Sequence, residues 1–136
     1  MSKVDLLKYI YTGGGSDTGH SDPEDVLSRV IEHLSDDFTV FSPGQSPIAG
    51  TFVGLEEFLG HLKKMQSLCS GSFHEELEGT FLADDKFGMV VHRLKGEREG
   101  KTLDTWGFGL FRFEDDKVVA HWECVGDQQQ WDNFWS

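Results

Sequence analysis

Cysteine, proline and positive charge are all scarce in this sequence. Its two cysteines, Cys69 and Cys124, lie far apart and form no CxxC pair. Neither a disulfide framework nor a zinc ribbon can be built from them. We therefore expect both residues to be reduced thiols of a cytoplasmic protein.

Long apolar runs are absent as well. No stretch approaches the roughly 18 consecutive apolar residues of a membrane-spanning helix, and residues 1–5 do not begin an apolar signal segment. These absences predict a cytosolic location and no membrane partner.

The shortage of positive charge is large, because 12 Lys and Arg residues stand against 24 Asp and Glu residues, a formal net charge of −12. Nucleic-acid binding rests on Lys and Arg that neutralise phosphates, so this field would repel a nucleic acid. An anionic membrane surface is disfavoured for the same reason. We expect no nucleic-acid partner.

What the sequence does contain is aromatic residues, with 11 Phe and four Trp in 136 residues. The length suits a single domain over residues 1–136, and so many aromatic side chains need an interior to occupy. The sequence therefore predicts one globular domain with a sizeable core.

The first half of the chain is predicted to form three helices. The first is short and ends at the glycine-rich run 12–16, and the second is capped by Asp22, begins with Pro23 and carries an apolar stripe as far as Leu34. The third follows Gly54 and continues through Met65. The glycine-rich run is interpreted as a loop, or as a lid over a cavity, because no phosphate-binding motif follows it.

Strands are predicted after the helices. A short strand over 38–41 precedes the third helix, and long strands with turn residues between them follow at 72–83, 87–97, 102–114 and 117–126. Helices followed by antiparallel strands indicate an α+β fold. We expect a curved, mostly antiparallel sheet wrapped around the three N-terminal helices, with one cavity.

Several segments resemble SnoaL-like proteins of the ketosteroid-isomerase and nuclear-transport-factor-2-like superfamily. Residues 34–38 and 42–54 resemble the helix-to-strand entry of that family, 111–123 its closing hairpin, and 127–128 with 132–135 the tail of one uncharacterised branch. The resemblance covers nearly the whole chain. It implies a cone-shaped barrel that forms a single SnoaL-like domain. It also implies a partly apolar pocket that binds a small, mostly apolar organic molecule. The same fold hosts isomerases, cyclases, hydrolases, dehydratases and proteins without catalysis.

Alignment with the hairpin of the ketosteroid isomerases implies which strand residues face the cavity. They are Val90, His92, Leu94, Thr105, Gly107, Gly109, Phe111, Phe113, Val119, His121, Glu123 and Val125. Two histidines and one carboxylate thus share a ring of apolar side chains.

That polar group has two interpretations. In the first, His121 or His92 is a general base and Glu123 orients it, since histidine works near neutral pH and a neighbouring carboxylate fixes its tautomer. In the second, a hydrogen-bonded His–Glu pair fills a polar spot in the core.

The remaining ligand contacts are expected from Val90, Gly109, Phe111 and Val125 on the strands, and from Gln45 in the loop near the cavity mouth. The resemblance also implies that Tyr9, on the first helix, lies roughly where an oxyanion-binding tyrosine would be.

Two departures from the isomerase pattern affect the predicted activity. Ser42 stands where the resemblance requires an aspartate base, and Gly109 stands where it requires a protonated acid. Steroid isomerisation through that acid–base set is therefore not expected.

No metal and no cofactor are predicted. His74-x-Glu76, His92 and His121-x-Glu123 offer donor atoms, but no dense ligand motif is present. His20, His33 and His61 are expected on loop or helix surfaces without a chemical role, and Glu75, Glu76 and Glu78 on a solvated strand edge.

The other sheet face carries Trp106, Phe108, Leu110 and Trp122. An exposed patch of this kind is unusual in a monomer, so we expect a homodimer through the outer sheet face. The alternative is that Trp131, Phe134 and Trp135 fold back to cover the patch.

Three functions remain open at this point. The first is an isomerase, dehydratase or hydrolase that acts by proton transfer, favoured by the inward His and Glu residues. The second is a non-catalytic ligand-binding or dimeric interaction module, favoured by the missing acids. The third is a regulatory subunit that binds a different protein through the outer sheet face.

Overall fold

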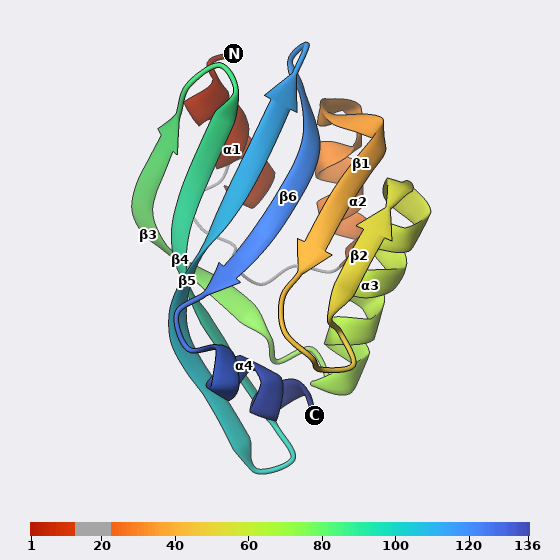
Figure 1. Cartoon of the computed structure of the whole chain (residues 1–136), viewed down its shortest axis with the longest axis vertical. Coiled ribbons are helices and arrows are strands. Elements are labelled where there is room, and N and C mark those ends of the chain that lie inside the picture. The colour runs from red at the N-terminus through yellow and green to blue at the C-terminus, as the bar shows by residue number, and fades with distance from the viewer. Residues whose placement is uncertain (13–22) are drawn as a thin grey trace.

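Six strands form one strongly twisted sheet in the order β2-β1-β6-β5-β4-β3 (Figure 1). The structure, a computed structural model, describes residues 1–12 and 23–136, apart from the side chains of Asp25 and Val26. The strands are β1 (Leu34–Ser42), β2 (Gly50–Val53), β3 (His74–Ala83), β4 (Phe87–Arg98), β5 (Lys101–Glu114) and β6 (Lys117–Val125). All neighbouring pairs are antiparallel except β1 and β6, which are parallel.

Helices α1 (Lys3–Thr12), α2 (Pro23–Val30) and α3 (Gly54–Leu68) lie on one face of this sheet (Figure 1). The predicted α+β fold, with a mostly antiparallel sheet curved around three N-terminal helices, is confirmed. Within the described residues β2 and β3 are not paired with each other, so the cone is open along one side. The predicted cap Asp22 and the glycine-rich run 13–16 lie outside the described residues.

Two tight hairpins set the register of the long strands. Glu99 and Gly100 have φ values of 51° and 78°, and Asp115 and Asp116 have 50° and 64°. Two consecutive positive φ angles are characteristic of the type I′ turn, whose twist matches that of the flanking strands. The predicted long strands therefore appear with almost the predicted ends.

The second helix ends earlier than the sequence predicted. A 3₁₀ turn (Ile31–His33) follows α2, and β1 already begins at Leu34. Ile31 is 46% exposed, whereas Leu34, Phe38 and Val40 are buried. These three residues alternate along a strand, so they reach the core from extended backbone and not from a helix face.

A β-bulge changes which side of β6 faces the interior. Phe113 pairs with Val118, but Arg112 pairs with Ala120, so Val119 is the extra residue. A bulge of this kind inverts the alternation of the strand. The prediction that Val119 points inward is therefore wrong: Val118 is fully buried, and Val119 is only half-buried.

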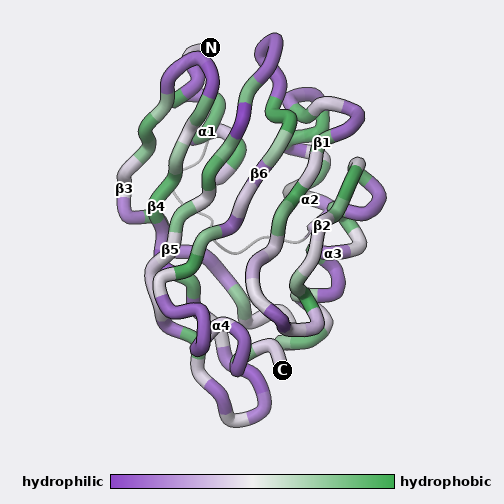
Figure 2. Tube along the Cα trace, in the orientation of Figure 1, coloured by the Kyte–Doolittle hydropathy of each residue, from purple (hydrophilic) through white to green (hydrophobic). Residues whose placement is uncertain are grey.

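Hydrophobic residues are concentrated along the strands, while the turns at both ends of the sheet are hydrophilic (Figure 2). A first core cluster joins α1, α2 and the sheet through residues such as Leu7, Phe38 and Val118. A second cluster lies at the opposite end, around Met65 and Leu94. No helix within the described ranges is long and apolar enough to cross a membrane.

A fourth helix, α4 (Gln128–Trp135), closes the end of the molecule opposite to the N-terminus (Figure 1). Asp127 caps it by accepting a hydrogen bond from the Gln130 backbone N–H. Trp131, Phe134 and Trp135 are almost completely buried in the second core cluster. The alternative that this tail covers the outer patch is wrong, because Trp106 stays 52% exposed.

Candidate functional site

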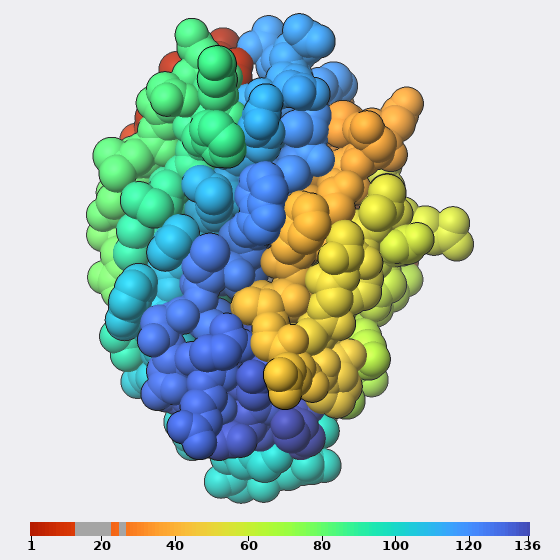
Figure 3. Space-filling model, in the orientation of Figure 1, coloured from red at the N-terminus to blue at the C-terminus, as the bar shows by residue number. Residues whose placement is uncertain are grey.

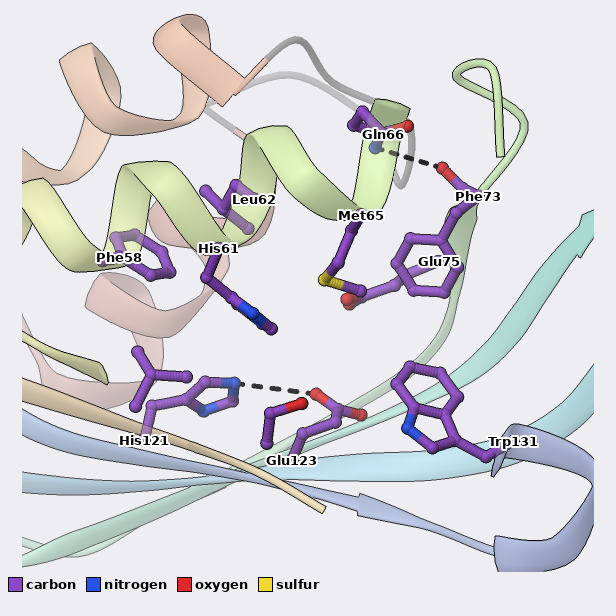
Figure 4. Close-up of a pocket in the computed structure, with 12 residues that line it drawn as sticks. Phe58, His61, Leu62, Met65, Gln66, Phe73, Glu75, His121, Glu123 and Trp131 are labelled. Atoms are coloured by element: carbon purple, nitrogen blue, oxygen red, sulfur yellow. Dashed lines mark hydrogen bonds and ion pairs between the residues drawn. The ribbon is translucent and has the colours of Figure 1, made fainter. Parts of the chain in front are cut away.

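A cavity of about 90 Å³ lies between α3 and the inner face of the sheet (Figure 4). Residues from α3, from three strands or the turns that flank them and from α4 line it. They are Val40, Ser42, Phe58, His61, Leu62, Met65, Gln66, Phe73, Glu75, His121, Glu123 and Trp131. The wall thus includes Trp131 of the fourth helix.

Four titratable groups meet beside this cavity. His121 and Glu123 are on β6, with 3.6 Å between His121 Nε2 and Glu123 Oε2. His92 on β4 lies behind them, with its Nε2 3.4 Å from Glu123 Oε1. The same nitrogen is 3.6 Å from Glu75 Oε2 on β3. Strands β3, β4 and β6 of one sheet thus bring two imidazoles and two carboxyl groups together.

Burial controls the protonation of the pair on β6. It raises the pKa of Glu123 to about 8, with the charge of His92 lowering it and that of Glu75 raising it further. Burial also lowers the pKa of His121 to about 4. At neutral pH Glu123 is therefore a carboxylic acid and His121 a neutral imidazole.

The tautomer of His121 follows from its backbone contact. Nδ1 lies 3.3 Å from the Leu110 carbonyl oxygen, which can only accept, so Nδ1 carries the hydrogen. In the neutral ring Nε2 is then an acceptor, and it faces Glu123. Phe111 stacks on the other side of the ring at a centroid distance of 4.3 Å and fixes its orientation.

His92 is fully buried, and neither of its ring nitrogens has a hydrogen-bond partner among the described residues. Oε1 of Glu123, which faces this histidine, is also without one. A buried polar group without a partner costs free energy, so these groups are under electrostatic strain in the described structure.

Glu75 was expected on a solvated edge, and this expectation is wrong. Its side chain is 25% exposed, lines the cavity and approaches His92. Glu75 pairs with the inward-facing Leu94, which gives it the inward parity of β3. His74 and Glu76 have the opposite parity and form their own ion pair at 3.1 Å.

His61 on α3 is the second group that the sequence interpretation placed on the surface. It is 7% exposed, lines the cavity opposite His121 and stacks on Phe52 at 4.3 Å (Figure 4). Burial lowers its pKa to about 4. The spacing from Phe58 to His61 and Met65 is that of one helix face, and this signal was present in the sequence.

The tyrosine beside the site is Tyr11, whereas the predicted Tyr9 packs its ring against His33 at 5.4 Å. The Tyr11 ring lies 6.0 Å from that of His92 and 5.9 Å from that of Phe111. Burial raises its pKa well above the ordinary value, and the charges of Glu75 and Glu123 add to this effect. Tyr11 follows the buried Leu7 by four residues, so it shares the buried face of α1.

The other predicted ligand contacts lie in different surroundings. Val90 is fully buried in the first core cluster, and Val125 packs against the second. Gln45 is exposed, and its backbone N–H donates to Asp132 at 3.0 Å. At Gly109 an added Cβ would lie 2.6 Å from the Tyr11 hydroxyl oxygen and 2.8 Å from the His121 ring, so these two side chains occupy that space. None of the four residues lines the cavity.

Donor atoms of Glu75, His92 and Glu123 lie within 4.8 Å of one another. Within the described part of the chain, this is the group whose spacing a metal ion could bridge. Carboxylate and imidazole donors suit several divalent cations, and a buried His–Glu network has the same composition without one. The expectation that no metal is bound stays a prediction.

Comparisons with known proteins agree with this fold. A family model described as a SnoaL-like domain matches residues 22–121. An uncharacterized protein of Mycobacterium tuberculosis is 24% identical over 110 residues, which cover 81% of this chain and 84% of that protein.

Two solved structures are similar over nearly their whole length. Bal32a from a soil-derived mobile gene cassette is 25% identical, with a TM-score of 0.82 and coverage of 97% of this chain and 95% of that one. A protein of unknown function with a cystatin-like fold from Xanthomonas campestris is 26% identical, also with a TM-score of 0.82, and the coverage is 100% and 99%. These relatives support the fold and leave the activity open.

Proposed function

We propose that this chain, which belongs to the SnoaL-like domain family, binds a small organic molecule in the cavity and transfers a proton to or from it. The observation that carries the proposal is the pair His121 and Glu123 on the cavity wall, 3.6 Å apart. One of these groups is a neutral base and the other a protonated acid at the same pH.

Such a pair suits general acid–base chemistry. Environments that separate the protonation states of two neighbouring groups assign them opposite roles. His121 Nε2 accepts a proton from the bound molecule, and Glu123 donates one to it. His92 and Glu75 position Glu123 from behind. The reaction is an isomerisation, a dehydration or a hydrolysis, all of which need one acid and one base.

Hydrogen–deuterium exchange tests this proposal without knowledge of the natural substrate. In D₂O a protein with this pair is expected to exchange the α-hydrogens of a small carbonyl compound, which proton NMR detects as loss of signal. The compounds are butanone, aminoacetone and pyruvate, which are neutral, cationic and anionic. His121→Ala and Glu123→Gln are expected to lower the exchange rate by about 10²–10⁴-fold.

The matched control is Glu114→Gln, because Glu114 is an exposed carboxylate on β5 outside the cavity. It is expected to leave the exchange rate unchanged. Exchange no faster than in buffer for all three compounds, with the fold intact by circular dichroism, would contradict proton transfer. Bound compound in ligand-observed NMR under those conditions would instead support the second candidate, a non-catalytic binding module, which Ser42 and Gly109 already favour.

A homodimer through the outer sheet face is a separate part of the proposal. Trp106 on β5 is 52% exposed, and Trp122 on β6 stacks on Phe41 at 5.1 Å. Figure 3 looks onto this face, where β1 and β2 (orange and yellow) lie beside β3 to β6 and α4 covers only the lower end. An isologous contact between two copies would bury these aromatic side chains.

Sedimentation velocity tests the dimer. The wild-type chain is expected to sediment as a dimer, and Trp106→Asp is expected to shift it to the monomer because a buried, unpaired carboxylate opposes association. Val53→Asp is the control, since Val53 is also 50% exposed but lies on β2 at the sheet edge. A monomeric wild-type chain would contradict the dimer and leave the face free for a different protein.

A further inference from the structure

No group of the cavity lining carries a positive charge at pH 7. The lining contains the carboxyl groups of Glu75 and Glu123 and no Lys or Arg. Both histidines of the lining, His61 and His121, are neutral at pH 7 because burial lowers their pKa to about 4. Lys64, whose charge also lowers the pKa of His61, is exposed, and its ammonium group donates to the Pro47 carbonyl oxygen outside the cavity.

Aromatic side chains form the wall beside these carboxyl groups. Phe73 and Trp131 meet edge to face at a centroid distance of 5.8 Å. Figure 4 shows this pair at one end of the cavity, next to Glu75 and Glu123, with Phe58 toward the other end. An aromatic ring attracts a cation to its face through its quadrupole, and a desolvated contact contributes about 2 kcal/mol.

The volume limits the size of an occupant. An apolar cavity of about 150 Å³ is large enough for benzene. The present cavity measures about 90 Å³, so it suits a compact group smaller than benzene. A tetrahedral centre that carries methyl groups has this shape.

From these contacts we infer that the cavity binds a small organic cation, an amine or a quaternary ammonium group with about four to six non-hydrogen atoms. The inference deepens the proposed function and rests on it, because the same cavity is the binding site. It replaces the mostly apolar ligand that the sequence predicted with one that is apolar in its methyl groups and positively charged.

An unpartnered oxygen of Glu123 supports this inference. Oε1 of Glu123 is buried and has no hydrogen-bond partner within the described residues. A cation between Glu75 and Glu123 would supply the positive charge that the cavity lacks. The ammonium group of an amine would also donate to these carboxylates.

Binding is expected to depend on pH. Burial raises the pKa of Glu123 to about 8, and a bound cation would lower it toward neutral pH, where Glu123 still serves as an acid and cation binding is linked to partial release of its proton. The titratable groups that face Glu123 are Tyr11 on α1, His61 on α3, Glu75 on β3, His92 on β4 and His121 on β6. Affinity for a permanent cation should therefore rise between pH 6.5 and pH 8.

Calorimetric titration with tetramethylammonium and with tert-butanol tests the inference. Both molecules have five non-hydrogen atoms and similar shapes, but only the first is charged. In amine-free buffer with EDTA, tetramethylammonium is expected to bind at least about tenfold more tightly than tert-butanol. The difference should increase at pH 8. Glu75→Gln and Glu123→Gln are each expected to remove most of it.

Glu76→Gln is the matched control, because Glu76 is the outward neighbour of Glu75 on β3 and is expected to leave both affinities unchanged. Equal affinities for the two probes, or tighter binding of tert-butanol, would contradict the inference that the cavity prefers a cation. The proposed function would not be affected by that result. If neither tetramethylammonium nor tert-butanol binds, the inference of a cation-binding cavity is contradicted. If the NMR exchange assay then also fails for all three carbonyl compounds, the proposed function fails with it.

Discussion

Replacement of Trp131 by alanine is expected to lower the free energy of unfolding by about 3–5 kcal/mol. The indole is 1% exposed and packs between Phe73 at 5.8 Å and Trp135 at 5.6 Å. Its loss would leave a void between α4 and the sheet and remove one wall of the cavity. Single domains have a total stability of about 5–15 kcal/mol, so this loss is a large fraction of it. Urea unfolding followed by circular dichroism measures the change.

Trp131→Phe is the informative control. The indole Nε1 of Trp131 has no hydrogen-bond partner in the described structure, so a phenyl ring forfeits no hydrogen bond. The expected cost is then less than about 1.5 kcal/mol, in the range of conservative hydrophobic replacements. If the alanine variant unfolded at the wild-type urea concentration, α4 would not be part of the core.

The second large effect concerns pH. The pKa of Glu123 is about 8 in the folded chain against an ordinary 4.5, so its contribution to stability is complete below pH 4.5 and is lost as the pH rises through 8. The pKa values of His61 and His121 are about 4 against 6.5, so their contribution is complete above pH 6.5 and is lost as the pH falls toward 4.

These opposing contributions place the maximum of stability near pH 6.5. From there to pH 8 the free energy of unfolding is expected to fall by about 1 kcal/mol, because the loss from Glu123 exceeds the remaining gain from the two histidines. Toward pH 4 it is expected to fall by about 2–3 kcal/mol, because two histidines outweigh one carboxyl group. Urea titrations at several pH values measure both limbs.

Glu123→Gln separates the two limbs. Glutamine resembles the protonated acid, so the variant should lack the alkaline limb and be about 4 kcal/mol more stable than the wild type at pH 8. Glu114→Gln, with its side chain 60% exposed, should leave the profile unchanged. An alkaline limb that persists in Glu123→Gln would show that another group causes it. A variant that gains stability and loses proton transfer would identify Glu123 as a residue held in a costly state for activity.

The sequence was sufficient for most of the fold and for half of the site. Strict alternation along β4 and β5 places His92 and Phe111 on the inner face, as predicted, because regular antiparallel strands preserve parity. His121 and Glu123 also face inward, although the bulge at Val119 separates them from the inward Val118. That outcome depended on alignment with a related hairpin, since a bulge has no reliable signature in one sequence.

The missed residues have different causes. Glu75 belongs to a run of acidic residues, and such a run normally indicates a solvated edge, so its charge favours an outward position although its parity on β3 is inward. His61 follows the helical spacing of Phe58 and Met65, although a histidine on an amphipathic helix is normally a surface residue. Tyr11 has the helical spacing of the buried Leu7, whereas the expectation for the site tyrosine concerns Tyr9. The spacing of Trp131, Phe134 and Trp135 also fits one face of a helix, which would have predicted α4.

The bulge in β6 also determines where this strand can tolerate the deletion of one residue during evolution. Because Val119 has no partner on β5, its loss would turn 118 and 120 into ordinary neighbours without moving any later pair of the ladder. A one-codon deletion next to this point would be absorbed as the strand slides by one residue. The same deletion nearer Val125 would turn the residues beyond it to the other face. The unpaired Val119 can thus be lost in evolution while His121 and Glu123 on β6 still face the cavity.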